Sequence, residues 1–351
     1  MSLFDNILGN NESLFTDELA LDYEYLPRLL PYREDQQHYI ASCIKPLLQG
    51  RNGKNLLITG QPGIGKTAAT RFVLRELEEQ GLDDNIYLIY INCWKKETPH
   101  KAALEICSLI GYKYTQDKST DQLLKETARI INKKAAVFVF DEIDKMQEFS
   151  LLYNLLDEIN KKTILLITNE QSFISSLDSR ISSRLSAELL EFKPYNLEET
   201  LGILKQRAEH AFIPGCWQKE ALSKIAEAAF NKQDIRQGLF LLRESALIAE
   251  SASSRQINTQ HASQAIFKLP AIKMISSNSI DKEALLVLNL VKQHSGKSSK
   301  EIYELYNQAS NKSFRTFHRK LKELASNKMI AIYNTNIKGI NTAIVHYTTK
   351  E

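Results

Sequence analysis

Three glycines are followed by a lysine and a threonine within eight residues of the first quarter of the chain. Residues 60–67 read Gly-Gln-Pro-Gly-Ile-Gly-Lys-Thr, a full match to GxxxxGK[ST], between an apolar run and a helical stretch at 68–80. Glycines let backbone N–H groups turn toward phosphate oxygens, and a helix start adds its positive dipole end. Lys66 would reach the β- and γ-phosphates of a nucleotide, and the Thr67 hydroxyl would bind Mg²⁺. The candidate nucleotide contacts here are Gly60, Gln61, Pro62, Gly63, Ile64, Gly65, Lys66, Thr67 and Ala68.

A pair of carboxylates follows the apolar run 135–140. Asp141 would hold the Mg²⁺ shell, and Glu142 would orient or activate the water that attacks the γ-phosphate. Such a pair often marks only a strand end entering a turn, but its place downstream of a phosphate loop favours the catalytic interpretation. Asp144, in the same run, is expected to serve the start of the next helix.

Asn169 ends a further apolar run at 163–168. An amide at this place can hydrogen-bond both the γ-phosphate and the attacking water, and so report whether that phosphate is present. Asn at a strand end commonly serves turn formation instead. The two preceding motifs favour the sensor interpretation.

The elements that would position these side chains alternate between short apolar runs and helical stretches. Fully apolar strands that alternate with helices indicate an α/β fold with a parallel sheet covered on both faces. The expected strands are 55–59, 86–92, 135–140, 163–169 and 187–192. We therefore expect a nucleotide-binding core at 21–195, preceded by a flexible acidic tail at 1–20.

The remainder of the chain is expected to form two further domains. Residues 196–270 read as helical throughout, and Asn196 with Glu199 resembles a capping box that opens this lid. A linker rich in Ser and Asn follows at 271–281. Residues 282–351 show three helical stretches and then two β-like runs, which is the order of a winged helix.

Charge is distributed unevenly along the chain. Residues 271–351 carry 13 Lys and Arg against 6 Asp and Glu, whereas 1–270 carry 32 against 36. A basic C-terminal unit points to a polyanionic partner. No apolar run is long enough to span a bilayer and the acidic N-terminus is no secretory signal, so we expect a cytoplasmic, nucleoid-associated protein with no membrane partner.

The third helix of the last domain, 313–326, has an apolar face and a basic face at helical spacing. The basic face would enter a groove of duplex DNA, and a hairpin tip would reach the adjacent minor groove. A solvated cationic face, or a winged helix used for protein contacts, is the alternative. The candidate DNA contacts are Ser313, Arg315, Thr316, His318, Arg319, Lys322, Lys338 and Gly339.

From about residue 24 to the C-terminus, the chain resembles the archaeal replication initiators related to the eukaryotic origin recognition complex and its Cdc-type helicase-loading partner. These are AAA+ ATPases with a C-terminal winged helix. The matching segments are 30–34 (LPYRE), 141–144 (DEID), 177–184 (LDSRISSR), 192–195 (FKPY), 207–215 (RAEHAFIPG) and 234–239 (DIRQGL). One departure is Asn231-Lys232-Gln233, where the family usually has a Gly before the Asp of the last segment.

The resemblance implies further site residues. Arg236 would be the sensor 2 arginine that reaches the γ-phosphate from the lid, although an arginine solvated beside its neighbour Asp234 is the alternative. Arg184, with Arg180 second, would be a finger that acts on the ATP of a neighbouring protomer. The residues expected around the adenine and at the start of the lid, where ordinary packing is the alternative for the tyrosines, are Tyr25, Leu26, Pro27, Arg33, Tyr195 and Arg207.

The function implied by the resemblance is ATP-dependent initiation of DNA replication. The chain would bind ATP or ADP with Mg²⁺ and double-stranded DNA at replication origins, and it would help load the replicative MCM helicase beside other initiator protomers. ATP hydrolysis would be slow and would act as a switch. Two other classes stay open on the sequence: a STAND-type signalling ATPase, and an AAA+ regulator of transposition or transcription.

Overall fold

The computed structural model describes residues 13–82, 84–170, 172–277, 282–294, 296–310, 313–326, 330–337 and 340–347. The chain divides into two compact units, Met1–Ile266 and Phe267–Glu351. Among the helices that the structure describes, none is both long and apolar enough to cross a bilayer.

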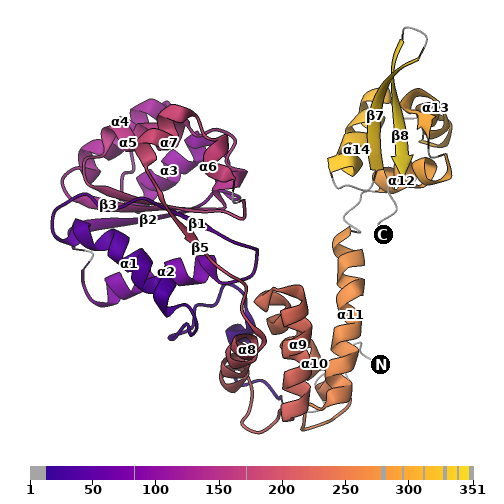
Figure 1. Ribbon diagram of the computed structural model, residues 1–351, viewed down its shortest axis with the longest axis horizontal. Coiled ribbons are helices and arrows are strands. Elements are labelled where there is room, and N and C mark those ends of the chain that lie inside the picture. Colours follow the sequence, from indigo (N-terminus) through magenta and orange to yellow (C-terminus); the bar gives the residue numbers. More distant parts are fainter. Residues whose placement is uncertain are drawn as a thin grey trace. The chain divides into compact units, whose positions relative to one another are not determined.

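A five-stranded parallel sheet forms the centre of the first unit, as the apolar runs predicted (Figure 1). Its strand order is β2-β3-β4-β1-β5. The strands are β1 Leu56–Thr59, β2 Ile86–Asn92, β3 Ala135–Asp141, β4 Lys162–Ile167 and β5 Glu188–Glu191. β4 lies between β1 and β3 and is parallel to both. The carboxyl ends of these three strands are therefore neighbours, and that edge is where open α/β sheets bind ligands.

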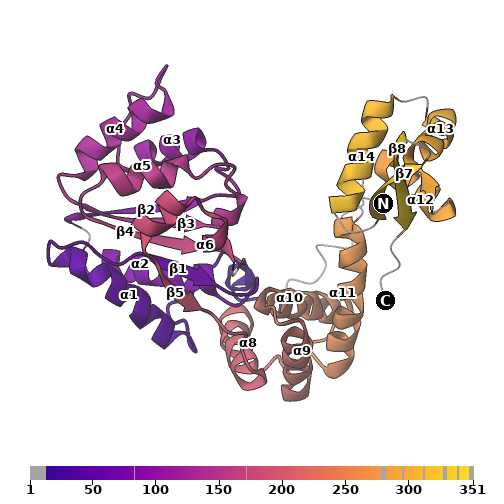
Figure 2. The same cartoon turned by 45° about the horizontal axis from the view of Figure 1, so that its top comes forward.

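Helices cover both faces of this sheet (Figures 1 and 2). α1 and α2 pack on one face, while α3, α4, α5 and α7 pack on the other. The helices of the core are α1 Glu34–Leu48, α2 Lys66–Glu79, α3 Pro99–Leu109, α4 Thr120–Ile131, α5 Ser150–Glu158, α6 Phe173–Ser176 and α7 Ser179–Leu185, with 3₁₀ turns η1 Glu18–Leu21 and η2 Ile143–Lys145.

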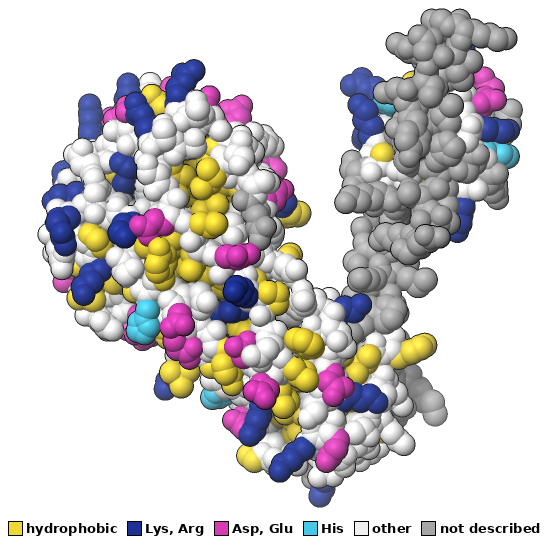
Figure 3. Space-filling model, in the orientation of Figure 1, with side chains coloured by type: hydrophobic (Ala, Val, Ile, Leu, Met, Phe, Trp, Pro, Cys, Tyr) yellow, Lys and Arg dark blue, Asp and Glu magenta, His cyan; other side chains and the backbone are white. Residues whose placement is uncertain are grey.

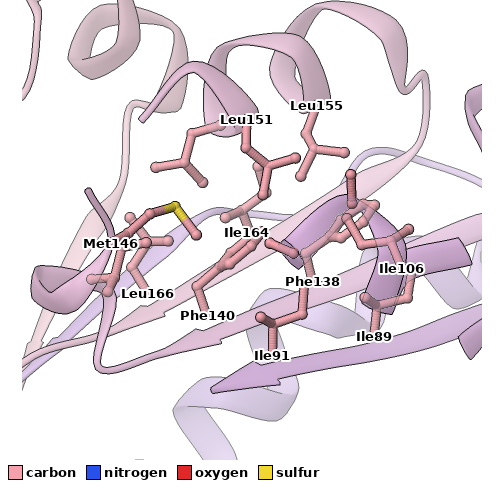
Figure 4. Close-up of a cluster of buried hydrophobic side chains, with 14 of the residues drawn as sticks. Ile89, Ile91, Ile106, Phe138, Phe140, Met146, Leu151, Leu155, Ile164 and Leu166 are labelled. Carbon is pink, nitrogen blue, oxygen red and sulfur yellow. The ribbon is translucent and has the colours of Figure 1, made fainter. Parts of the chain in front are cut away.

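All seven residues of β3 are buried, and alternate side chains face opposite helical layers. Phe138 and Phe140 lie stacked in the layer with α3, α4 and α5, where Figure 4 shows them beside Ile106 and Leu151. Val137 and Val139 belong to the other layer. A strand buried on both faces is held rigidly, so Asp141 at its end and Glu142 immediately after it are held in a fixed place.

Helices α8, α9 and α10 form the lid within the same unit. They are α8 Leu197–Ala211, α9 Lys219–Lys232 and α10 Ile235–Ser251. The capping box expected at the start of α8 is present: the Glu199 N–H donates to Asn196 Oδ1 and the Asn196 N–H to Glu199 Oε2, both at 2.8 Å.

The N-terminal segment packs on the lid from residue 13 onward, although the sequence suggested a flexible tail through residue 20. Leu14 and Ala20 are buried. The Leu14 N–H donates to Glu250 Oε1 at 2.6 Å, and the Thr16 N–H donates to the Ala211 carbonyl at 2.8 Å. The acceptors lie on α8 and α10, about two hundred residues away, which is why local composition did not reveal this anchoring.

Helix α11, Thr259–Ser277, continues into the segment that was expected to be a linker. Residues 271–275 read Ala-Ile-Lys-Met-Ile, and most of these residue types favour helices. The expected linker is therefore helical up to Ser277, and the division between the two units falls earlier, between Ile266 and Phe267.

The second unit has the element order of a winged helix: three helices and then a β-hairpin. A two-residue strand that the sequence did not suggest pairs with the hairpin, in the order β6-β8-β7. The elements are α12 Lys282–Gln293, β6 Lys297–Ser298, α13 Ser299–Ser310, α14 Phe314–Ser326, β7 Ile330–Ile337 and β8 Ile340–Tyr347. Phe317, Leu321 and Leu324 of α14 are buried in the core of this unit, whereas Phe314 is 46% exposed.

Candidate nucleotide site and nucleic-acid interface

The loop between β1 and α2 holds three glycines in backbone conformations that other residues rarely adopt. φ is +145° at Gly60, +77° at Gly63 and +90° at Gly65. A Cβ added at Gly65 would lie 2.7 Å from the Tyr195 hydroxyl oxygen. Gly65 immediately precedes α2, which no side chain caps. The first N–H groups of α2 are thus free to bind an anion.

Lys66 is almost fully buried inside this loop. Its Nζ donates to the carbonyls of Gly60 and Gln61 and to Asn169 Oδ1, each at 2.8 Å. Burial lowers the pKa of Lys66 to about 8, and the nearby Asp141 carboxylate opposes this shift. The three acceptors hold the ammonium group within the phosphate loop, and the hydrogen bond to Asn169 brings the residue after the end of β4 next to this loop.

The two carboxylates at the end of β3, Asp141 as its last residue and Glu142 next to it, differ in environment. Asp141 is 3% exposed; its Oδ2 accepts from the Thr67 hydroxyl at 2.9 Å, and its Oδ1 accepts from the Glu142 N–H at 3.0 Å. A hydroxyl and a carboxylate oxygen this close form a donor set that suits Mg²⁺. Glu142 has a left-handed backbone, with φ +55°. Burial, and then the charge of Asp141, raise the pKa of its carboxyl. A raised carboxyl pKa brings Glu142 closer to the range suited to a general base.

Asp144 has a structural role, but not the expected one at the start of the next helix: it lies within η2, and no side chain caps α5. Asp144 accepts from the Thr168 hydroxyl at 2.9 Å and pairs with Lys145 at 2.6 Å. These partners tie η2 to the end of β4. The carboxylate of Asp144 therefore supports the strand ends that carry Asp141 and Asn169.

A cavity of about 490 Å³ opens above the phosphate loop, between the core and the lid. This volume is suitable for a nucleotide. Candidate residues that line it are Pro27, Pro62, Gly63, Gly65, Lys66, Thr67, Ala68, Asp141, Glu142, Asn169, Tyr195, Arg207 and Arg236. The other candidates of the first unit are not among the described residues that line it: Tyr25, Leu26, Arg33, Gly60, Gln61, Ile64 and Arg184.

Residues 13–31 form a strap, and its second half, from Tyr23 to Pro31, lines one side of this cavity. On the lid side, Arg207 donates to the Ala20 and Tyr25 carbonyls, both at 3.1 Å, and its guanidinium lies 5.0 Å from the Tyr25 ring centroid. On the core side, Arg75 of α2 donates to the Leu26 and Pro27 carbonyls at 3.2 and 2.8 Å. The middle of the strap is thus fixed on the lid side and on the core side by arginines that bind its backbone.

Arg33 lies behind the phosphate loop, and its side chain is only 4% exposed. It donates twice to the Ile64 carbonyl, at 3.2 and 3.0 Å, and once to the Lys193 carbonyl at 2.7 Å. Its guanidinium lies 3.8 Å from the Tyr195 ring centroid. Arg33 thus shapes the loop from below, while Tyr195 is the member of this pair that lines the cavity.

Arg236 enters the cavity from the first turn of α10. Its guanidinium makes two hydrogen bonds to Asp234, at 3.0 and 2.8 Å. Asp234 is also the N-cap of α10, since its Oδ1 accepts from the Arg236 N–H. The arginine expected to sense the nucleotide is therefore held by a carboxylate on its own helix.

Arg184 and Arg180 lie on α7, away from the cavity. Arg184 pairs with Asp157 and lies 4.8 Å from the Tyr153 ring centroid. Arg180 is 3.8 Å from Asp178. The side chains of Arg180 and Arg184 are 81% and 45% exposed, so both are accessible to a neighbouring protein.

Sequence reasoning missed several residues of the cavity wall. Tyr90 of β2 donates to Asp141 Oδ2 at 2.6 Å, and Arg71 of α2 lies over its ring. Gln206 and Leu239 line the lid side. Leu239 ends the segment 234–239 that the sequence had singled out, and the only signal for Tyr90 was its place two residues before the end of an apolar run.

The basic face of α14 is exposed in the second unit. Arg315, His318, Arg319 and Lys322 are exposed, and Thr316 is half-buried. At the helix start, the Thr316 N–H lies 3.4 Å from Ser313 Oγ. Figure 3 shows dark-blue Lys and Arg side chains on the visible surface of this unit. The two remaining candidates, Lys338 and Gly339, lie outside the described residues.

Comparisons with known proteins agree with this architecture. Residues 49–173 match the AAA domain, and residues 201–266 match the Cdc6 AAA+ ATPase-type lid domain. The chain is 32% identical over 324 residues to ORC1-type DNA replication protein 1 of Archaeoglobus fulgidus, covering 87% of this chain and 79% of the relative. It is 31% identical over 369 residues to the ORC1-type DNA replication protein of Methanoregula boonei, covering 95% and 86%.

A solved structure, that of the Aeropyrum pernix ORC1 protein in complex with DNA, superposes on 96% of this chain and 94% of its own, with a TM-score of 0.80 and 26% identity. The matches to the core, to the lid and to the solved structure thus all point to the same family. The chain belongs to the family of ORC1-type DNA replication proteins: it is a nucleotide-binding AAA+ ATPase and an ATP-dependent replication initiator.

Proposed function

We propose that this initiator binds ATP·Mg²⁺ between its core and lid, binds duplex DNA at replication origins through its second unit, and helps load the replicative MCM helicase. The observation that carries the nucleotide part is the cavity in which the phosphate loop, the two carboxylates and a lid arginine converge. Helicase loading is proposed from the family resemblance alone.

Thr67 and Asp141 would hold the Mg²⁺, which when bound neutralises charge on the β- and γ-phosphate oxygens. Lys66 would exchange its loop carbonyls for phosphate oxygens. Glu142 would orient the attacking water and take up its proton, and Asn169 would hydrogen-bond the same water. These side chains mainly position the reactants and stabilise the charge that develops in the transition state, which is what phosphoryl transfer requires.

The lid supports a switch function. Arg236 would leave Asp234 for the γ-phosphate of ATP and return after hydrolysis, because a charged phosphate competes with a carboxylate for the same guanidinium. α10 would then occupy different positions in the ATP and ADP states. Slow turnover suits such a switch, in which the bound nucleotide defines the state.

DNA binding is supported by the basic exposed face of α14 and by the likeness to an initiator solved in complex with DNA. Ser313, Arg315 and Thr316 at the helix start would contact phosphate and groove, with Arg319 and Lys322 further along. Lys338 and Gly339 would reach the adjacent minor groove. Arg184, with Arg180 as the second candidate, would complete the ATP site of a neighbouring protomer on DNA.

Footprinting on the parent genome tests the proposal. Protection with ATP at repeats within replication origins is the expected result. Protection confined to promoters would favour the transcription-regulator class, and no protection under any nucleotide condition would favour a STAND-type signalling role. An Arg319→Ala/Lys322→Ala variant, assayed in parallel, shows whether any protection depends on α14.

A further inference from the structure

Asp141 is held by three hydrogen bonds from three separate parts of the core. Its Oδ2 accepts from the Tyr90 hydroxyl at 2.6 Å and from the Thr67 hydroxyl at 2.9 Å. Its Oδ1 accepts from the Glu142 N–H at 3.0 Å. The donors come from β2, from α2 and from the backbone that follows β3. The carboxylate plane therefore has no rotational freedom while all three bonds are made.

Tyr90 is itself fixed in place. Its ring packs against the apolar layer formed by α1 and α2, and the Arg71 guanidinium lies 5.9 Å from its centroid. In the parallel pairing of β2 with β3, Tyr90 stands opposite Val139 and Asn92 opposite Asp141. The phenol thus runs along the strand direction toward the carboxyl edge, where it also lines the cavity.

A phenylalanine would fill the same apolar space without placing a hydroxyl beside a buried carboxylate. The hydroxyl matters when the Thr67 oxygen turns to a metal, because Oδ2 then loses one of its two donors. Tyr90 would be the side-chain donor that continues to hold Oδ2. A carboxylate held in one orientation binds a cation or its water shell without the entropic cost of being ordered first.

We infer that Tyr90 is a positioning residue for the metal site: it orients the Asp141 carboxylate toward the Mg²⁺ that accompanies the nucleotide. This inference rests on the proposed ATP·Mg²⁺ function and extends it by one residue. Tyr90 touches neither the phosphates nor the attacking water in this role, and it acts only through Asp141.

The test is the dependence of nucleotide affinity on free Mg²⁺, measured with a fluorescent ADP derivative on the full chain. Tyr90→Phe removes the hydroxyl alone. We expect an unchanged affinity in EDTA, and a roughly tenfold or greater increase in the Mg²⁺ concentration that gives half of the metal-dependent gain, the usual size for loss of an orienting hydrogen bond. Tyr87→Phe is the matched control, because Tyr87 lies on the same strand against the opposite apolar layer. It should match the parent.

A second pair of variants separates positioning from packing. In an Asp141→Asn background, Tyr90→Phe should add no further shift in the Mg²⁺ midpoint, since the group through which it acts has been altered. A midpoint equal to the parent's, a shift that persists in that background, or an equal loss of affinity in EDTA would each overturn the inference. A parent protein whose ADP affinity ignores Mg²⁺ would instead contradict the metal site itself, and the role of Tyr90 with it.

Discussion

Gly63 of the phosphate loop and Asp234 of the lid lie in direct contact. A Cβ added at Gly63 would come within 1.9 Å of Asp234 Oδ1. The next lid residue, Ile235, donates its N–H to the Gly63 carbonyl at 3.1 Å. Because Asp234 also holds the Arg236 guanidinium, the loop that receives the phosphates is connected to the lid arginine through a single carboxylate.

Gly63→Ala should weaken nucleotide binding and also lower the free energy of unfolding. The methyl group must displace Asp234, and φ of +77° is unfavourable for alanine. We expect at least a tenfold loss of ATP affinity and a loss of more than about 2 kcal/mol in the free energy of unfolding. Equilibrium binding and denaturant titration measure the two effects.

Gly111→Ala is the matched control for this variant. Its φ is +78°, and nothing lies within 4 Å of the added Cβ. Backbone strain alone should cost about 1 to 2 kcal/mol there, with ATP affinity unchanged. Equal losses of stability in both variants, together with unaltered ATP affinity in Gly63→Ala, would show that the contact with Asp234 has no influence on the site.

Arg207→Met should loosen the strap along the cavity. The change keeps much of the aliphatic stem but leaves the carbonyls of Ala20 and Tyr25 without their donor. Arg207 is 7% exposed, so we expect a loss of about 2 to 4 kcal/mol in the free energy of unfolding. Hydrogen exchange should increase most in residues 13–31.

Lys205→Met, on the same helix, is the control for Arg207. Its side chain is 66% exposed and is 4.0 Å from Glu209, so its loss should leave stability nearly unchanged. Similar behaviour of the two variants would mean that the strap does not depend on the buried arginine.

The contrast between Lys66 and Arg33 indicates how far sequence alone could predict this site. The loop around Lys66 is local in sequence, so the motif placed it together with its strand and helix. Arg33 also belongs to a family segment and suggested a nucleotide contact. It instead binds the Ile64 and Lys193 carbonyls, 31 and 160 residues away, and such contacts have no local pattern.

The anchoring of the strap and the hydrogen bond from Tyr90 to Asp141 could not be predicted from local sequence, for the same reason. Leu14 is anchored by Glu250 and Tyr90 contacts Asp141 only because the fold brings distant segments together. The parallel sheet and the lid helices, by contrast, followed from apolar runs and from the capping box at Asn196, because those signals are contained in each segment. Burial on both faces made the strands easy to recognise.

The affinity for ATP should fall as pH rises above 8. Burial lowers the pKa of Lys66 to about 8 in the chain alone, and neighbouring phosphates would raise it again because they favour the ammonium. At a pH between the pKa of Lys66 in the free chain and its higher pKa in the ATP complex, the complex holds one more proton than the free chain. Binding therefore takes up protons and weakens with rising pH. Calorimetry at pH 8.5 in two buffers of different ionisation enthalpy measures this uptake.

Lys66→Arg provides the control for that experiment. A guanidinium keeps its charge throughout this pH range, so the variant should bind with a pH-independent affinity even if that affinity is lower. Proton uptake that persists in Lys66→Arg would assign the effect to another group.

Replacing Arg319 and Lys322 by alanine should weaken DNA binding without changing ATP turnover. Both side chains are exposed on α14, whose opposite face is buried in the core of the unit. Each phosphate contact contributes close to one unit to the slope of log affinity against log salt, so the double variant should lower the magnitude of that slope by about two. Fluorescence anisotropy with origin duplex at several salt concentrations gives both quantities.

Lys297→Ala/Lys300→Ala carries the same change of net charge outside α14, on β6 and α13, where both lysines are exposed. If α14 enters the groove, this control should retain most of its affinity and its salt slope, because long-range attraction is screened within about 10 Å at ordinary ionic strength. Equal losses in the two double variants would mean that DNA responds to net charge alone, and α14 would then lose its assignment as the recognition helix. A loss confined to the α14 variant, with discrimination between origin and unrelated duplex also reduced, is the outcome that the buried and basic faces of this helix predict.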